Sequence, residues 1–248
     1  MKILIIRHGD PDYENDTLTE KGHKEAEYLA ERLIKYPIKD VYCSPLGRAK
    51  ATAEHYLNKV NKEMTVLPWL REFSGTIIRP DTKQEGYCWD FMPKVWSGDE
   101  KLFSKLTWLE SDIMKTGTAK KVYEETISGI DSLLLSYGYK RDGYIYKAEN
   151  NTRDTIAIFC HYAMGMTILS HFTGISPSLL WQTMFLPPTS VTTLVTEERV
   201  KGEVIFKCKQ MGDSSHLYVK GEEPSNSGLY NEIYSETSID GAKLSHEL

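Results

Sequence analysis

The 248-residue chain lacks several features that would assign it to common classes of protein. No apolar run approaches the roughly 18 residues that a membrane span requires, so no membrane partner is expected. The apolar start, residues 1–6, is too short for a signal peptide. The four cysteines form no C-x-x-C pair. Without an export signal, they are expected to be free thiols in the cytoplasm, with disulfides as the lesser alternative.

Excess charge of one sign is also missing from most of the chain. The net charge is −5, and residues 221–248 alone account for it, with six acidic residues against one lysine. Residues 1–220 are therefore neutral, and no nucleic-acid partner is expected. The sequence predicts a single domain over residues 1–220, followed by an acidic, solvated and weakly ordered tail over residues 221–248.

Three catalytic signatures are absent. A cysteine phosphatase requires C-x5-R, but Cys43 precedes Arg48 by one residue too few. The histidines show no H-E-x-x-H or similar spacing, and no G-x-G-x-x-G is present. The chain is therefore expected to need neither a metal ion nor another cofactor.

Segments with the patterns of strands and helices alternate along the chain. Thr19 is a plausible N-cap for a helix that ends before Pro37, and Ser44 is a plausible N-cap for the next helix, with Pro45 in its first turn. Further strands are expected at residues 2–6, 40–43, 65–67 and 155–160, further helices at 119–138 and 163–173, and a terminal hairpin at 191–195 and 204–207. This order predicts an α/β fold with a mostly parallel central sheet flanked by helices.

Residues 73–118 are irregular and rich in aromatic residues. Together with residues up to about 150, they are predicted to form a helical or irregular lid inserted over the sheet. One hypothesis is that Trp89, Phe91 and Trp96 select the organic part of a substrate. The alternative is that these aromatic side chains only pack the lid onto the sheet.

Polar residues suited to phosphate chemistry stand where the predicted strands end. Arg7-His8-Gly9 and His161 follow two of these strands, Arg48 lies shortly after a third, and Glu72 follows the possible strand 65–67. In α/β sheets, sites form beyond the carboxyl ends of the strands. Arginine matches phosphate oxygens with its planar fork, and a histidine with one unprotonated nitrogen can attack phosphorus. Gly9 would let the backbone pass close to the phosphate.

The order of these residues resembles the histidine phosphatase superfamily, which includes the phosphoglycerate mutases. The blocks that carry the resemblance are Ile6-Arg7-His8-Gly9, Leu18-Thr19-Glu20-Lys21-Gly22, residues 44–53 (SPLGRAKATA), Leu70-Arg71-Glu72, Phe159-Cys160-His161, residues 190–194 and residues 212–217. The resemblance covers residues 1–72 and 155–217.

The resemblance implies a phosphatase that hydrolyses the phosphate monoester of a small molecule through a phosphohistidine. His8 would be the nucleophile. Arg7, Arg48 and His161 would hold the phosphoryl oxygens and stabilise the transition state. Glu72 would protonate the leaving oxygen and then activate water.

Two blocks depart from the family pattern. The usual R-H-G-E-T loop is replaced by residues 10–16 (DPDYEND), in which Asn15 is the candidate to replace a lost phosphate donor. Asp10 in this loop competes with Glu72 for the role of acid. The usual S-H-G-G is replaced by residues 160–163 (CHYA). The alternatives are a phosphoglycerate-type mutase, which the shortened first loop mildly disfavours, and a non-catalytic binding module on the same fold.

Overall fold

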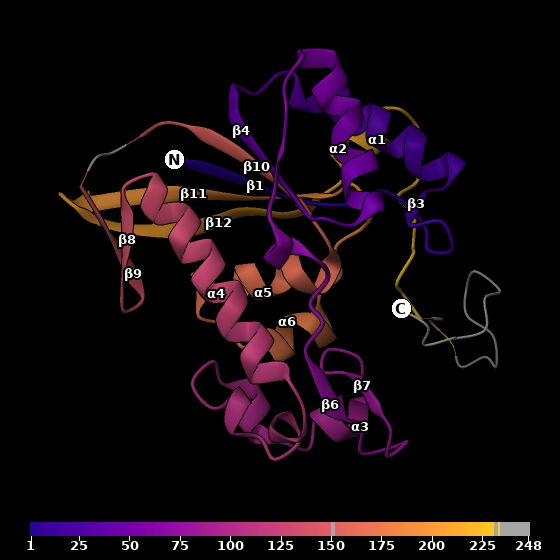
Figure 1. The fold of residues 1–248 in the computed structure, drawn as a ribbon, viewed down its shortest axis with the longest axis vertical. Coiled ribbons are helices and arrows are strands. Elements are labelled where there is room, and N and C mark those ends of the chain that lie inside the picture. The colour runs from indigo at the N-terminus through magenta and orange to yellow at the C-terminus, as the bar shows by residue number, and fades with distance from the viewer. Residues whose placement is uncertain (150–151, 231–232, 234–248) are drawn as a thin grey trace.

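The computed structural model describes residues 1–149, 152–230 and 233 (Figure 1). Its centre is an eight-stranded sheet in the order β5-β4-β10-β1-β11-β12-β9-β8. The strands are β1 (Lys2–Arg7), β4 (Ile38–Cys43), β5 (Thr65–Val66), β8 (Tyr139–Asp142), β9 (Ile145–Ala148), β10 (Thr155–Cys160), β11 (Val191–Val200) and β12 (Glu203–Asp213). Strands β5, β4, β10 and β1 pair in parallel. Strand β11 pairs antiparallel with β1, and β12, β9 and β8 continue the sheet from β11 in antiparallel pairs.

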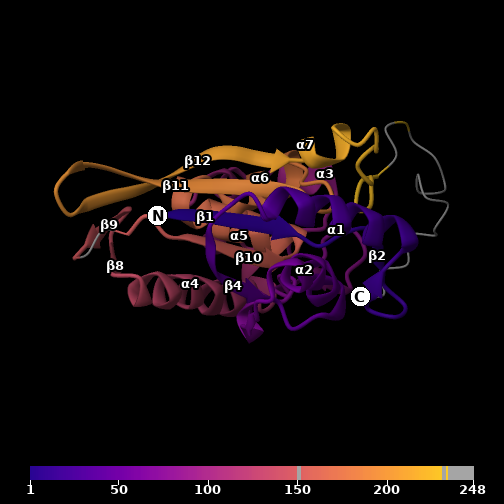
Figure 2. The ribbon, with the colours of Figure 1, turned by 90° about the horizontal axis from the view of Figure 1, so that it is seen from above.

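Helices cover both faces of this sheet (Figure 2). The main ones are α1 (Glu20–Leu33), α2 (Gly47–Val60), α4 (Ala119–Ser136), α5 (Tyr162–Thr173), α6 (Pro177–Thr183) and α7 (Ser215–Tyr218). Alternate residues of β1 enter two separate cores, because successive strand side chains point to opposite faces. Leu4 and Ile6 pack with α1 and α2, whereas Ile3 and Ile5 pack with α4, α5 and α6. The predicted α/β class, with a central sheet flanked by helices, is confirmed.

Most of the predicted elements are present, but α2 begins later than expected. Thr19 caps α1 as predicted, because its Oγ1 accepts a hydrogen bond from Gly22 N at 3.0 Å. Ser44 is not the cap of α2, which begins at Gly47 after Leu46. The Ser44 hydroxyl instead bonds to His161. The terminal hairpin is longer than predicted, and the β8–β9 hairpin and helix α6 were not predicted.

The region between β5 and α4 contains short elements, as its irregular sequence indicates. They are η1 (Pro68–Leu70), β6 (Thr76–Ile78), β7 (Glu85–Tyr87), α3 (Pro93–Trp96), η2 (Glu100–Phe103), η3 (Trp108–Glu110) and η4 (Met114–Thr116). Two further short strands, β2 (Pro11–Asp12) and β3 (Thr17–Leu18), lie between β1 and α1. Phe91 and Trp108 are buried in the core with α4 and α5, which supports packing as their role. Trp89 and Trp96 are only partly buried against that core.

All four cysteines are free: Cys43, Cys88 and Cys160 are buried, and Cys208 is partly exposed. Within the described part of the chain, no helix is both long and apolar enough to cross a bilayer.

Residues 222–230 lie against the domain. Ser225 is 6% exposed, and Glu222 forms an ion pair with Lys24 of α1. The rest of the stretch predicted to be a tail, residues 231–232 and 234–248, lies outside the described residues apart from Ile233.

Candidate active site

His8 lies immediately after the central strand β1 and is 2% exposed. Its backbone N donates to Cys160 O at 3.0 Å, which extends the β1–β10 pairing by one residue. Its ring Nδ1 lies 2.7 Å from Gly9 O. Because a carbonyl oxygen only accepts, Nδ1 must carry the proton. The neutral ring therefore presents an unprotonated Nε2, which is the form that a nucleophile requires.

The surroundings of His8 favour this neutral form. Burial, followed by the positive charges of Arg7 and Arg48, lowers the pKa of His8 well below its ordinary 6.5. The lowered pKa therefore favours the neutral imidazole, with its single proton on Nδ1, at neutral pH. His161 lies beside it, with 5.1 Å between the ring centroids.

Arg7, the last residue of β1, is buried with its guanidinium held by main-chain oxygens. Nη1 donates to Leu186 O at 2.6 Å, and Nη2 donates to Ser227 O at 2.9 Å. The group also lies over the rings of Tyr162 and Phe185, 5.7 and 5.6 Å from their centroids. All four of these partners are neutral, so none of them cancels its positive charge.

Arg48, in the first turn of α2, has an anionic partner. Its Nη1 donates to Asp16 Oδ1 at 2.8 Å, and Gly47 N donates to Asp16 Oδ2 at 2.6 Å. The Asp16 carboxylate therefore lies at the N-terminus of α2, where the helix dipole and unpaired N–H groups favour an anion. Asp16 is 45% exposed in its side chain, whereas Arg48 is 9% exposed.

His161, directly after β10, is held by Ser44. The distance between His161 Nε2 and Ser44 Oγ is 2.7 Å, and Ser44 Oγ also accepts from Leu46 N at 3.2 Å. In the tautomer in which Ser44 donates its proton to His161 Nε2, the ring proton is on Nδ1. That Nδ1 is buried and has no partner among the described residues. In that tautomer it is a hydrogen-bond donor available to a phosphate oxygen.

Glu72 lies two residues after η1 and is fixed by main-chain donors from two directions. Phe73 N and Met164 N, in the first turn of α5, both donate to its Oε1, at 2.8 and 3.0 Å. Burial raises the pKa of Glu72 above its ordinary 4.5, although these two bonds and the charges of Arg48 and Arg7 oppose the rise. A carboxyl with a raised pKa beside two arginines is suited to transfer a proton.

The structure brings together five of the seven predicted site residues: Arg7, His8, Arg48, Glu72 and His161. Asn15 is exposed, and its Nδ2 donates to Asp12 Oδ2 at 2.8 Å. Its side-chain amide therefore stabilises the turn at residues 13–16. Gly9 has a packing reason to be glycine, since a Cβ there would lie 2.8 Å from Gly22 O of α1. The backbone N of Gly9 donates to Thr52 Oγ1 at 2.9 Å.

Asp10 differs from Glu72 in that both of its carboxylate oxygens are engaged. Thr19 Oγ1 donates to Oδ2 at 2.6 Å, and Ser225 Oγ donates to Oδ1. Its backbone N donates to Glu25 Oε2 at 3.1 Å. Glu25 is fully buried in α1, and this burial raises its pKa to about 7.

Sequence reasoning missed Asp16, Glu25, Thr52 and the carbonyl groups that hold Arg7. A charged residue at an inward position of an amphipathic helix was the available signal for Glu25, which shares the buried face of α1 with Ala26 and Leu29. Asp16 and the carbonyls had no comparable signal.

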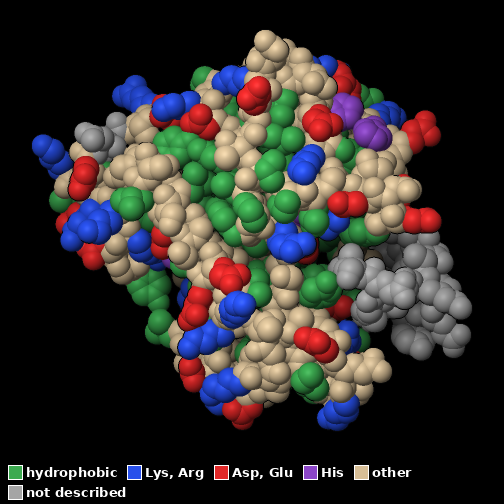
Figure 3. Space-filling view, viewed as in Figure 1, with side chains coloured by type: hydrophobic (Ala, Val, Ile, Leu, Met, Phe, Trp, Pro, Cys, Tyr) green, Lys and Arg blue, Asp and Glu red, His purple; other side chains and the backbone are tan. Residues whose placement is uncertain are grey.

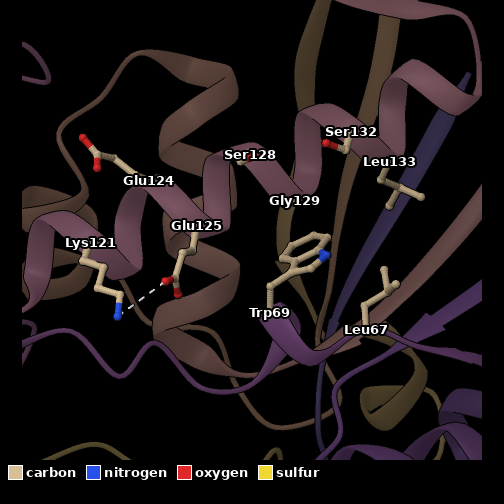
Figure 4. A pocket seen from close by; sticks show the side chains of 9 residues that line it. All are labelled: Leu67, Trp69, Lys121, Glu124, Glu125, Ser128, Gly129, Ser132 and Leu133. Carbon is tan, nitrogen blue, oxygen red and sulfur yellow. Dashed lines mark ion pairs between the residues drawn. The ribbon is translucent and has the colours of Figure 1, made fainter.

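A surface groove between η1 and α4 is separate from this site (Figure 4). The Trp69 ring packs on Gly129 of α4, where an added Cβ would lie 2.5 Å from the ring. Lys121 and Glu125 form an ion pair of 4.0 Å at one end. On the face shown in Figure 3, acidic and basic side chains are interspersed around a central apolar area.

Comparisons with known proteins agree with this geometry. Residues 3–94 match the family model of the histidine phosphatase superfamily, branch 1. A probable phosphatase of Schizosaccharomyces pombe is 24% identical over 239 residues, which cover 88% of this chain and 95% of that protein. A 2,3-bisphosphoglycerate-dependent phosphoglycerate mutase of Thermoplasma acidophilum is 39% identical over 75 residues, and the chain spans only 38% of that protein's length.

A solved structure has the same fold along almost all of its length. It is a mutant phosphoserine phosphatase of Entamoeba histolytica in complex with phosphoserine, with a TM-score of 0.57 and 20% identity. The match covers 87% of this chain and 98% of that one. Residues 3–94, which contain β1, α1, β4 and α2, are therefore similar to the histidine phosphatase superfamily, branch 1, and the chain shares the fold of this solved structure through the rest of the domain.

Proposed function

We propose that the protein is a phosphatase that hydrolyses phosphate monoesters of a small molecule through a phosphohistidine on His8. The observation that carries the proposal is the buried, neutral His8 ring, with its proton held by Gly9 O and its Nε2 unprotonated beside two guanidinium groups. A buried imidazole next to two positive charges is well suited to attack a phosphate group, because the arginines stabilise the charge of the phosphoryl oxygens.

In the first step, His8 Nε2 attacks phosphorus, and the bond from phosphorus to the ester oxygen breaks. The leaving oxygen takes a proton from Glu72 and departs as an alcohol. Arg7, Arg48 and His161 Nδ1 hold the three remaining phosphoryl oxygens during the transfer.

In the second step, water attacks the phosphorus of the phosphohistidine. Glu72, now ionised, takes a proton from that water, the bond from phosphorus to His8 Nε2 breaks, and inorganic phosphate leaves. The engagement of both Asp10 oxygens by Thr19 and Ser225 supports Glu72 rather than Asp10 as the group that exchanges protons.

The relatives support hydrolysis as the outcome. The relative that matches over 88% of the chain is named as a probable phosphatase, whereas the mutase matches over 75 residues. The four free thiols, three of them buried, support a reducing compartment such as the cytoplasm.

Labelled water distinguishes hydrolysis from a mutase reaction, in which the phosphoryl group returns to the substrate. In H₂¹⁸O, each inorganic phosphate released should carry one ¹⁸O atom, because water attacks the phosphorus of phosphohistidine. The measurement is mass spectrometry of the phosphate, with 2- and 3-phosphoglycerate interconversion assayed in parallel. Rapid interconversion with negligible phosphate release would identify a mutase and contradict the proposal.

Activity is expected to persist without a metal ion. Arg7 and Arg48 supply at the phosphoryl group the positive charge that Mg²⁺ supplies in many phosphoryl-transfer enzymes. The rate of phosphate release should therefore change by less than about twofold after dialysis against EDTA. Complete loss in EDTA, with recovery on adding back one divalent ion, would refute metal independence.

A further inference from the structure

The C-terminal segment, residues 222–230, lies against the same strand ends as the candidate active site. After α7 the chain reverses, and Glu222 N donates to Leu217 O at 3.0 Å. In Figure 1 this yellow segment runs from the side of α1 toward the insertion. At its far end, Tyr230 OH donates to Asp90 Oδ1 at 2.9 Å. The segment therefore connects the phosphate end of the domain with the insertion.

Glu25 joins this segment to the loop that follows His8. Its Oε1 accepts from Ser225 N at 2.9 Å, and its Oε2 accepts from Asp10 N at 3.1 Å. Ser225 Oγ donates in turn to Asp10 Oδ1 and accepts from Ser227 N at 3.1 Å. One buried carboxyl and one buried hydroxyl thus fix the position of Ser227 relative to the His8 loop.

Ser227 contributes its main chain to Arg7. Its carbonyl oxygen accepts from Arg7 Nη2 at 2.9 Å, while Leu186 O accepts from Nη1. A carbonyl orients the guanidinium by hydrogen bonding and leaves its full positive charge for an anion, whereas Asp16 partly neutralises Arg48.

Gly228 has a backbone conformation, and a close neighbour, that favour glycine over any residue with a side chain. Its φ is +92°, and a Cβ there would lie 3.1 Å from Arg7 Nη2. The guanidinium is buried between this residue and the rings of Tyr162 and Phe185, so it has little room to move away.

We propose that residues 222–230 are a positioning element of the phosphate site: Glu25 and Ser225 hold the segment so that Ser227 O and Gly228 fix the Arg7 guanidinium. This inference rests on the proposed function, since it assigns Arg7 to the phosphoryl group. It concerns phosphate binding rather than proton transfer.

The test uses full-length protein and inorganic phosphate as the probe, with binding measured by isothermal titration calorimetry. Gly228→Ala should weaken phosphate binding about tenfold, the loss expected when a charge-assisted hydrogen bond is displaced. Gly221→Ala is the matched control, because Gly221 also has a positive φ, +69°, but no atom within 4 Å of an added Cβ. It should bind phosphate like the wild type.

Ser225→Ala adds a variant without backbone strain. It removes the hydroxyl between Asp10 and Ser227 and should also weaken phosphate binding, with KM for a monoester raised more than kcat is lowered. Melting temperatures of all variants separate a local effect from loss of folding. If Gly228→Ala and Ser225→Ala bind phosphate like Gly221→Ala while the wild type hydrolyses monoesters, the positioning role is overturned and the function stands. If the wild type neither binds phosphate nor releases it, the proposed function fails, and this inference fails with it.

Discussion

Replacing His8 with alanine is expected to abolish turnover of every phosphate monoester, with a loss of at least about 10⁴-fold in kcat. The expected cause is the absence of the Nε2 nucleophile from a site that otherwise stays intact. Among the described residues, removal of the ring deletes a single hydrogen bond, from Nδ1 to Gly9 O. Steady-state kinetics with an alkyl phosphate measures the loss, and circular dichroism checks folding. His23→Ala, which removes an exposed histidine of α1, is the control.

The intermediate can be observed directly. Wild-type protein quenched after brief incubation with ³²P-labelled substrate should carry label that acid releases and base does not, as expected of a phosphohistidine. Peptide mapping should locate it on His8, and His8→Ala should carry none. Label on a serine, cysteine or aspartate would refute the mechanism.

Replacing Glu72 with glutamine is expected to lower kcat/KM for an alkyl phosphate by about 10²–10⁴-fold. The amide oxygen of glutamine can still accept from Phe73 N and Met164 N, so the side chain should keep its place. What it loses is the transferable proton, which an alkoxide needs and nitrophenolate does not. The loss for p-nitrophenyl phosphate should therefore be much smaller. The two substrates should be compared by kcat/KM, because this constant reports only the steps up to formation of the phosphohistidine. The later hydrolysis of the phosphohistidine is the same for both substrates.

Asp10→Asn is the matched control for this substitution. A selective loss on alkyl phosphates in Asp10→Asn, together with equal losses on both substrates in Glu72→Gln, would transfer the acid role to Asp10. The hydroxyl groups that engage both Asp10 oxygens argue for the opposite result.

The pH profile provides a second measurement on the same variant. In the proposed mechanism, the active form has a neutral His8 and a protonated Glu72. Activity should rise as pH increases through the pKa of His8, which lies well below 6.5, and fall as pH increases through the raised pKa of Glu72. In Glu72→Gln the alkaline fall should disappear for the alkyl phosphate. Titration of the substrate itself is the same for both enzymes.

The sequence indicated the residues of the candidate active site because each lies at or shortly after the end of a strand and belongs to a recognisable block. Arg7 and His8 extend β1, His161 extends β10, and Arg48 opens α2, so parallel pairing brings them to one edge. Local pattern was enough for these positions, because the signal and the residue lie within a few positions of each other.

The partners of these residues could not be predicted, because they come from distant parts of the chain and act through main-chain atoms. The Arg7 guanidinium is held by the carbonyls of Leu186 and Ser227, and any residue type has a carbonyl. Ser44 shows the opposite problem. Ser-Pro is a common helix start, and only the position of His161 in space reveals that the hydroxyl serves a different partner.

The place of β1 in the sheet has a consequence for how the chain folds. This strand precedes the other described strands of the sheet in the chain, yet its two neighbours are β10 and β11, which begin about 150 and 190 residues later. Pairing across such sequence separations is slow, since the loop between the partners must close first. On the ribosome, the apolar residues of β1 should stay unpaired until β10 emerges, and the contact of Arg7 with Ser227 should form only after Ser227 has emerged. Catalytic competence should therefore appear late in folding, after most of the secondary structure has formed.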